Sequence, residues 1–258
     1  MGLVPTMGAL HDGHFALVDT ARRHTDVVVV SIFVNPMQFE RADDFDQYPR
    51  TIESELAACR AHGVDAIYAP TATAMYPHGF TTSVAPGPLA DVLEGAARPG
   101  HFRGVTTVVA KLFNATQPHI AVFGEKDFQQ LAIIRRMTLD LDMPIEIIGL
   151  PTVREADGLA MSSRNRRLSD AQRQAAVVVP VMLQAVRSCF RSGERHTDVL
   201  LRAGRAVVDA EPLARFERLD LIDADTLRPV KIADLNTRLV TAVWFGDVRL
   251  IDNCAISD

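Results

Sequence analysis

The sequence predicts an α/β protein with a parallel sheet covered by helices on both faces, followed by a smaller α+β domain. Residues 27–34 form a run rich in β-branched side chains that is apolar on both faces, which is typical of a strand buried in a parallel sheet. Segments of this kind alternate with helical patterns as far as residue 149. After about residue 153 the pattern changes to helices followed by strand-like stretches. We therefore predict a Rossmann-like domain over residues 1–153 and a smaller domain over 154–258, with the junction near 153–160.

The composition sets further bounds. A chain of 258 residues, 48% hydrophobic and 23% charged, is long enough for one large or two moderate domains. The net charge of −5 argues against a broad nucleic-acid surface. Neither a membrane-spanning apolar run nor a signal-peptide pattern is visible, so no membrane partner is expected. Cys59, Cys189 and Cys254 are widely spaced and odd in number, which predicts reduced thiols in a cytoplasmic protein.

The first domain should contain its strands and helices in alternation. Expected strands are 2–5, 27–34, 65–70, a stretch near 81–84, 119–123 and 146–149. Expected helices are 13–24, about 50–62, a short one near 89–94, one that follows a Gly-rich turn at 98–104, and 127–141. In open sheets of this kind ligands bind at the carboxyl ends of the strands, near the point where the strand order reverses.

The second domain begins with a polar, basic loop at residues 161–167. Ser169 and Asp170 are expected to cap a long helix that extends to about Ser192, and Pro180 should kink or divide it. A further helix is expected at 197–209, and strands at 216–223, 238–245 and 248–253.

The stretch 5–14 carries the strongest chemical signal. His11 and His14 are three residues apart between a short apolar strand and a helical pattern, so they should share one face of the first helical turn. A helix N-terminus offers free N–H groups and a positive dipole end, which suit a phosphate. Asp12 can cap this helix, and Gly13 permits close approach of a ligand. We predict an anion site beneath two imidazoles.

Three weaker signals accompany it. Residues 124–127 join a strand to a helix with a glycine, a phosphate-neutralising lysine and an aspartate suited to a ribose hydroxyl. Hydroxyls and a guanidinium at 161–164 can clamp a polyphosphate. The amides of Gln38 and Gln130 can read hydroxyl and carbonyl groups. Taken singly, these are better explained as capping residues, an ordinary polar loop and surface glutamines.

Together, five motifs resemble one family over nearly the whole chain. They are PTMGALHDGH at 5–14, VNPMQF at 34–39, DQYPRT at 46–51, GEKDFQQ at 124–130 and MSSRN at 161–165. The resemblance is to the pantothenate synthetase (pantoate–β-alanine ligase) family of HIGH-type nucleotidyltransferases, related in fold to class I aminoacyl-tRNA synthetases. Family members usually carry a segment before the first strand, whereas Met1 lies only four residues before Pro5 here. We therefore expect a short first strand with weaker packing.

The resemblance implies two chemical steps. Pantoate attacks the α-phosphorus of Mg·ATP to give pantoyl adenylate and pyrophosphate, and β-alanine then displaces AMP to give pantothenate. His14 is implied as a general acid or charge stabiliser, and Lys126 and Arg164 as stabilisers of the leaving pyrophosphate. The implied catalytic residues are His11, His14, Lys126 and Arg164; the implied ATP site is Met7, Gly8, Ala9, Leu10, His11, Asp12, Gly13, His14, Gly124, Glu125, Lys126, Asp127, Val153 near the adenine, Met161, Ser162, Ser163 and Arg164.

The same resemblance implies the remaining partners. Gln38 would contact pantoate and β-alanine, and Gln130 would contact pantoate. Magnesium is implied with ATP but without an assigned protein ligand, because Glu53 and Glu55 are better explained as a solvated helix face. A homodimer formed by the larger domain is also implied. A hinge near 153–160 would let the second domain act as a lid.

Two alternatives remain open. A nucleotidyltransferase of the same superfamily could stop at an adenylylated product, although Gln38 and Gln130 favour the ligase. A nucleotide-sensing module without turnover is disfavoured by the intact set of His11, His14 and Lys126 with Arg164. Transfer-RNA charging is not expected, because the chain lacks an anticodon-binding domain and a basic face.

Overall fold

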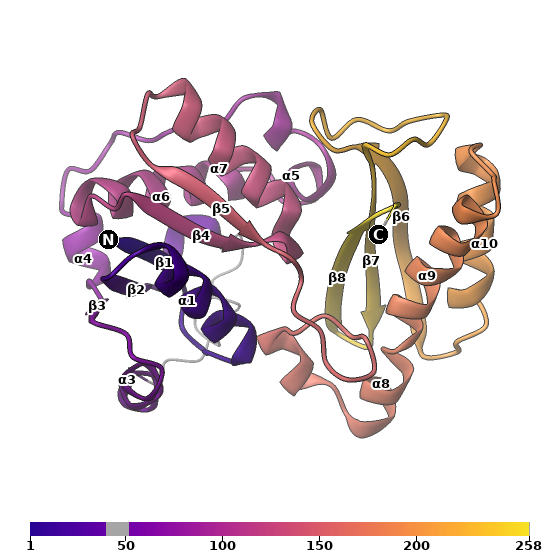
Figure 1. Cartoon of the computed structure of the whole chain (residues 1–258), viewed down its shortest axis with the longest axis horizontal. Helices are drawn as coiled ribbons and strands as arrows, with labels where there is room; N and C mark the ends of the chain where they lie inside the picture. Colours follow the sequence, from indigo (N-terminus) through magenta and orange to yellow (C-terminus); the bar gives the residue numbers. More distant parts are fainter. Residues whose placement is uncertain (40–51, 258) are drawn as a thin grey trace. The chain divides into compact units, whose positions relative to one another are not determined.

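The computed structural model describes residues 1–39 and 52–257, which fall into two compact units, Met1–Pro151 and Thr152–Asp258 (Figure 1). The expected motif at 46–51 and the start of the helix expected at about 50–62 lie outside the described residues. Among the helices that the structure describes, none combines the length and apolarity that crossing a bilayer requires.

The first unit is built on a five-stranded parallel sheet of order β3-β2-β1-β4-β5. Its strands are β1 (Gly2–Thr6), β2 (Val28–Ile32), β3 (Ala66–Tyr68), β4 (Ile120–Gly124) and β5 (Glu146–Leu150). The chain winds outward from β1 in one direction and then returns to place β4 on the other side of β1. This reversal puts the switch point between the carboxyl ends of β1 and β4. The predicted Rossmann-like sheet is confirmed.

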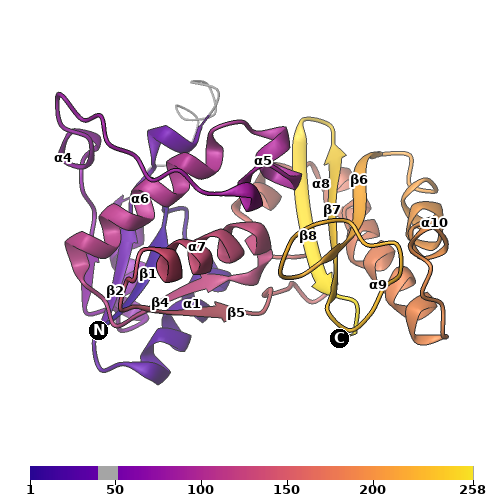
Figure 2. The same cartoon turned by 90° about the horizontal axis from the view of Figure 1, so that it is seen from above.

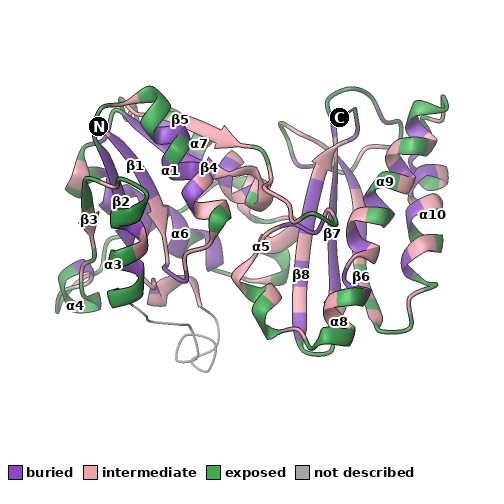
Figure 3. Cartoon of the chain, turned by 60° about the horizontal axis from the view of Figure 1, so that its bottom comes forward, coloured by how far each residue is buried: buried purple, intermediate pink, exposed green. Residues whose placement is uncertain are grey.

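Side chains that alternate along the strands form one core on each face of this sheet. Leu3 faces the core shared with helices α6 (His101–Thr116) and α7 (Phe128–Asp140). Val4 faces the opposite core, shared with α1 (Asp12–His24) and α3 (Ile52–Ala61). Helices therefore cover both faces (Figure 2), and the central strands are largely buried (Figure 3). Both Leu3 and Val4 are fully buried, and β1 has five residues like β2, β4 and β5.

Two expectations in the first unit were wrong. The stretch 98–104 is not wholly a turn, because α6 already begins at His101. Residues 81–84 form no strand, because the Val84 N–H and C=O bond to the side chains of Thr107 and Thr106 on α6 instead of to a neighbouring strand. The short helix expected near 89–94 is two pieces, η2 (Pro88–Ala90) and α5 (Leu93–Ala97). Other short helices in the described part of this unit are η1 (Pro36–Gln38), α4 (Ala72–Met75) and η3 (Glu125–Asp127).

The second unit is α+β, as predicted, and its sheet is antiparallel and packed against helices. Its strands β6 (Ala214–Asp223), β7 (Thr237–Phe245) and β8 (Val248–Ala255) lie in chain order. The long helix is divided into α8 (Asp170–Ala175) and α9 (Val178–Arg191), with Pro180 in the first turn of α9. Ser169 caps α8 in a capping box with Gln172. Helix α10 (Thr197–Val208) and α9 bury their apolar faces against the sheet, and η4 (Ser163–Arg167) precedes α8.

Candidate active site

Two histidines cap the helix that leaves β1. His11 is the N-cap of α1: its Nδ1 accepts the N–H of Gly13 at 3.2 Å, and the Nδ1 of His14 accepts the N–H of His11 at 3.3 Å. This reciprocal pair is a capping box made of imidazoles. The cap expected at Asp12 was wrong, since Asp12 is the first helical residue. The two ring centroids lie 4.1 Å apart, so the structure brings the rings together as predicted from their spacing.

The capping bonds determine which ring nitrogens remain for a ligand. A neutral imidazole that accepts at Nδ1 carries its proton on Nε2. Burial, together with the neighbouring His11 ring and the positive charge of Lys126, lowers the pKa of His14 to about 3. His14 is therefore neutral in the free protein and offers an Nε2–H donor. Of the two roles implied by the resemblance, hydrogen-bond stabilisation fits this state better than proton donation by an imidazolium.

A buried carboxylate shapes the turn between β1 and α1. Glu55 on α3 accepts the N–H of Ala9 at 2.5 Å and is only 5% exposed. Gly8 has φ +86°, and a Cβ there would lie 2.6 Å from Glu55 Oε1, so the turn requires a glycine beside this carboxylate. The expectation of a solvated face at Glu55 was wrong. Glu55 lies four residues before Cys59, so the two side chains share one face of α3. Since Cys59 is buried, this spacing is the signal in the sequence that could have indicated a buried Glu55.

The second motif lies beside the first in space. Lys126 and Asp127 sit in η3, directly after β4, with Lys126 Nζ 3.8 Å from Asp127 Oδ1. Both charges act on His14, the aspartate raising and the lysine lowering its pKa. The carboxyl ends of β1 and β4 thus bring the imidazoles, an ammonium group and a carboxylate close enough to change the pKa of His14 at the switch point.

Gln38 is held firmly at the carboxyl end of β2. Its Oε1 accepts from Asn35 Nδ2 at 3.0 Å, and its Nε2 donates to Met7 Sδ at 2.9 Å. The structure therefore joins Gln38 to the 5–14 motif, as the predicted site requires. Gln130 on α7 is half-buried, whereas the adjacent Gln129 is buried and bonds to the loop at 89–94.

Two residues that sequence reasoning missed hold the main chain of Gln38. Its carbonyl oxygen accepts from Arg98 at 3.1 Å and from His101 Nδ1 at 2.9 Å. Burial and the charge of Arg98 lower the pKa of His101 to about 4, so this ring is neutral. Gly104, one turn further along α6, allows the close approach: a Cβ there would lie 2.3 Å from the Met37 oxygen. The H-x-x-G spacing at the start of an amphipathic helix was the available signal.

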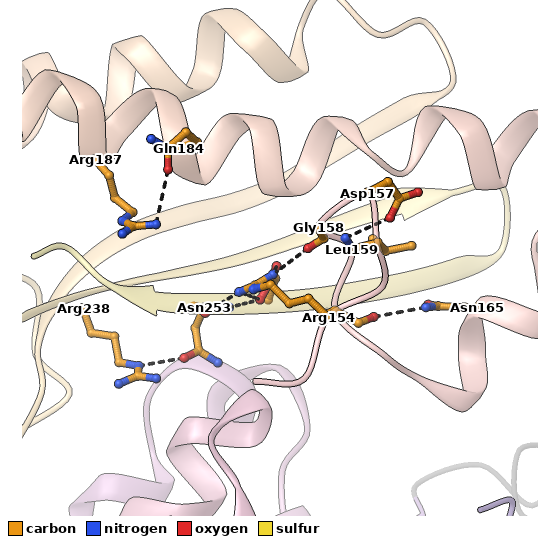
Figure 4. A network of polar contacts seen from close by, with 11 residues as sticks. Arg154, Asp157, Gly158, Leu159, Asn165, Gln184, Arg187, Arg238 and Asn253 are labelled. Carbon is orange, nitrogen blue, oxygen red and sulfur yellow. Dashed lines mark hydrogen bonds and ion pairs between the residues drawn. The ribbon is translucent and has the colours of Figure 1, made fainter. Parts of the chain in front are cut away.

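In the second unit, residues 153–161 form a short hairpin that leads into the 161–164 loop. Met161 donates its N–H to the Val153 oxygen at 2.9 Å, and Arg154 pairs with Ala160. Arg154 is fastened to buried Asp252 on β8 by two bonds of 2.7 and 3.0 Å. It also donates to the Gly158 oxygen at 3.0 Å (Figure 4). The stretch where we expected the junction is thus an anchored hairpin of the second unit.

The 161–164 loop carries the expected side chains at the start of η4. Ser162 caps η4 by accepting the Arg164 N–H at 3.3 Å, and the Arg164 guanidinium reaches the Arg249 oxygen at 3.4 Å. Asn165 pins the end of the loop to Glu155 and the Ala160 oxygen. The loop is therefore ordered, with its arginine at the surface.

Residues 1–39 and 52–257 supply no cluster of ligands for a metal ion. No group of three or more His, Cys, Asp or Glu side chains in these ranges is arranged to hold a cation. Glu53 is exposed, and Glu55 is engaged by Ala9.

Known proteins resemble this chain over its full length. The family model described as Pantoate-beta-alanine ligase matches residues 1–255. A pantothenate synthetase of Geotalea uraniireducens is 51% identical over 258 residues, covering 100% of this chain and 92% of the relative. One from Roseiflexus castenholzii is 54% identical over 256 residues, covering 99% and 92%.

Solved structures show the same likeness. A pantothenate synthetase of Thermus thermophilus superposes with a TM-score of 0.96 at 48% identity, covering 100% of this chain and 93% of that one. The enzyme of Francisella tularensis, complexed with Beta-gamma ATP and Beta-alanine, superposes with a TM-score of 0.79 at 34% identity, covering 100% and 90%.

Proposed function

Because this chain belongs to the pantoate–β-alanine ligase family and is an ATP-dependent ligase of pantoate and β-alanine, we propose that it works through a pantoyl adenylate. In the first step a pantoate carboxylate oxygen attacks the α-phosphorus of ATP, and the bond from that phosphorus to the bridging oxygen breaks to release pyrophosphate. In the second step the β-alanine nitrogen attacks the acyl carbon, the bond to the adenylate oxygen breaks, and AMP and a proton leave.

The observation that carries the proposal is the pair of imidazoles at the switch point, each of which accepts a main-chain N–H at its Nδ1. Their Nε2–H donors lie at the N-terminus of α1, where backbone N–H groups also suit an anion. Attack of a carboxylate on a polyanion is limited by charge repulsion and positioning, so fixed donors around the α- and β-phosphates stabilise the transition state. Lys126 would supply a full positive charge for the leaving pyrophosphate, and Asp127 would accept from the ribose.

The rest of the site extends this arrangement. Residues 7–14 and 124–127 would line the ATP site, with Gln38 on pantoate and β-alanine and Gln130 on pantoate. The second unit would act as a lid: Val153 would lie against the adenine, while Met161, Ser162, Ser163 and Arg164 would close over the phosphates. Closure excludes water, which would otherwise hydrolyse the mixed anhydride. The anchored 153–161 hairpin would move as part of that lid.

Several further assignments belong to the same proposal. Mg²⁺ would enter with ATP and neutralise part of the phosphate charge, and we assign it no protein ligand. The enzyme is placed in the cytoplasm, where ATP is supplied, and assembles as a homodimer through the first unit. Sedimentation of the purified protein tests the last assignment directly: a single species at monomer mass over the working concentration range overturns it.

One experiment tests the reaction. Protein, Mg·ATP and pantoate are mixed first, β-alanine is added second, and pyrophosphate, AMP and ADP are followed throughout. The proposal expects pyrophosphate with bound adenylate first, then AMP and pantothenate only after β-alanine. Formation of ADP rules out the adenylate. Release of an adenylylated product that β-alanine leaves unchanged indicates a nucleotidyltransferase, and absence of any turnover indicates a sensing module.

A further inference from the structure

We propose that Tyr76 is a positioning residue for the ligation, acting through Asn35 to hold the side-chain amide of Gln38 with an N–H directed to an acceptor oxygen of the substrate. The inference rests on the proposed contact between Gln38 and pantoate. It adds a residue that does not touch the substrate and names the chemical group that Gln38 recognises.

The side chain of Asn35 can adopt only one orientation. Its Oδ1 accepts the N–H of Met37 at 3.3 Å, and its Nδ2 donates to the Gly104 oxygen at 3.1 Å. A backbone N–H can only donate and a backbone carbonyl can only accept, so the oxygen and nitrogen of this amide cannot be exchanged. Asn35 is 1% exposed, and water therefore cannot replace these partners.

The orientation of Asn35 determines that of Gln38. The second Nδ2–H of Asn35 donates to Gln38 Oε1 at 3.0 Å, which identifies that atom as the acceptor and leaves Nε2 as the donor. One Nε2–H is directed to Met7 Sδ at 2.9 Å, a weak acceptor. The amide has a second Nε2–H, which can be directed to a ligand. Gln38 thus recognises an oxygen with a lone pair, such as the carboxylate or a hydroxyl of pantoate.

Tyr76 is the outer residue of a chain of hydrogen bonds, Tyr76 to Asn35 to Gln38, which we call the relay. Its hydroxyl donates to Asn35 Oδ1 at 2.7 Å, a shorter bond than the other three that hold this amide. Burial raises the pKa of Tyr76 to about 12, so the phenol keeps the proton that it donates. The ring itself packs edge-on against Phe80 and near Phe33. Ring and hydroxyl therefore do separate things: the ring fills the core beside α6, and the hydroxyl fixes Asn35.

This separation allows a clean test with Tyr76→Phe. The matched control is Tyr68→Phe, which removes a hydroxyl of the same unit whose contact is the Met75 sulfur at 4.0 Å. Removing the Tyr76 hydroxyl should raise the KM for pantoate about 3- to 10-fold, with the KM for ATP unchanged. The control should change none of these. An unchanged pantoate KM, or an equal rise in the ATP KM, overturns the inference.

A second variant covers the case in which Tyr76→Phe does not fold. A fluorinated tyrosine at position 76 keeps the ring and the hydroxyl but has a lower phenol pKa. As pH rises through that lowered pKa the donor is lost, and the pantoate KM should rise only in this variant. A pH profile that matches the unmodified enzyme overturns the inference, because a purely structural hydroxyl would not impose such a profile.

Gln38→Glu separates failure of the inference from failure of the proposed function. It replaces the Nε2 donor by an acceptor of the same shape, so the pantoate KM should rise at least as much as in Tyr76→Phe. If Gln38→Glu leaves the pantoate KM unchanged, the proposed substrate contact is wrong. If Gln38→Glu impairs pantoate binding while Tyr76→Phe does not, the substrate contact stands and the relay is wrong.

Discussion

Glu55 Oε1 accepts the N–H of Ala9 at 2.5 Å, and this bond joins α3 to the turn that delivers His11 and His14. Ala9 has φ +52°, a conformation that a residue with a side chain adopts at a cost. The buried carboxylate offsets that cost by satisfying the N–H that the strained turn exposes. A helix that contributes no residue to the predicted phosphate site therefore helps to set the geometry of the turn before α1.

Replacing Glu55 should weaken both folding and ATP use. Glu55→Ala leaves the Ala9 N–H buried without an acceptor, which costs on the order of 1–3 kcal/mol of folding free energy. Because the same turn carries His11 and His14, its displacement should also lower kcat/KM for ATP, by up to about 150-fold if the whole cost is expressed there. Glu55→Gln keeps an acceptor oxygen and should lose much less. Glu53→Gln on the exposed face of α3 is the control. If Glu55→Ala and Glu53→Gln lower kcat/KM for ATP equally, the bond from Ala9 to Glu55 does not contribute to ATP use.

Removing the imidazole of His14 should lower kcat by roughly 10²–10³-fold, because a fixed donor at the reacting phosphates is lost. His14→Asn retains a donor and an acceptor and should recover part of this activity. His24→Ala, at the exposed end of the same helix, should leave turnover unchanged. Single-turnover formation of pyrophosphate measures the effect, and a His14→Ala enzyme of near-normal rate would remove His14 from the mechanism.

The neutral histidines predict that stability rises with pH between about 5 and 6.5. The pKa of His14 falls from 6.5 in the unfolded chain to about 3, and that of His101 falls to about 4. Below pH 6.5 the unfolded chain thus binds protons that the folded protein does not, and stability is lost as pH falls. Each group contributes at most about 1.4 kcal/mol per pH unit.

Urea unfolding at half-unit steps from pH 5 to 8 measures this slope. Asp65, whose pKa is lowered from an ordinary value of 3.8 by the Val28 N–H and by Arg22, titrates below this range. His101→Asn should reduce the slope by about half. A slope of zero in the unmodified protein would show that both imidazoles can be protonated without opening the fold.

Breaking the Arg154–Asp252 pair should be costly in the second unit. The Asp252 side chain is 1% exposed, so Arg154→Met would leave a buried charge without its partner and lower the free energy of unfolding by about 3–5 kcal/mol. Arg167→Met is the control, since its 3.7 Å pair with Asp247 is exposed on both sides and should contribute about 0–1 kcal/mol. Thermal melting compares the two, and equal melting temperatures contradict the prediction.

Much of the architecture could be predicted from periodicity and motifs, because those patterns reflect burial along single elements. The apolar run at 27–34 predicted β2, and Pro180 predicted the divided helix. What local patterns could not reveal were bonds between distant elements. Val84 is satisfied by side chains of α6, so the extended stretch at 81–84 joins no sheet.

Bonds between distant elements also explain why some residues of the site were not predicted from the sequence. Their function depends on which elements pack together. Glu55 approaches Ala9 across 46 positions of sequence, and His101 approaches Gln38 across 63. The imidazoles at 11 and 14 were predictable because both lie on one turn of one helix, although their use as caps in place of Asp12 was not. Short-range chemistry can be inferred from sequence, whereas support from remote helices requires coordinates.

The imidazole capping box has a thermodynamic consequence for ligand binding. Side chains that are mobile before binding lose conformational entropy when they are immobilised, at about 0.5–1.5 kcal/mol each. His11 and His14 are already immobilised by the main chain of their own helix, so that loss occurs during folding and not when ATP arrives. Nucleotide affinity should therefore depend little on ordering these two rings, and their mean positions should not change when the substrate enters.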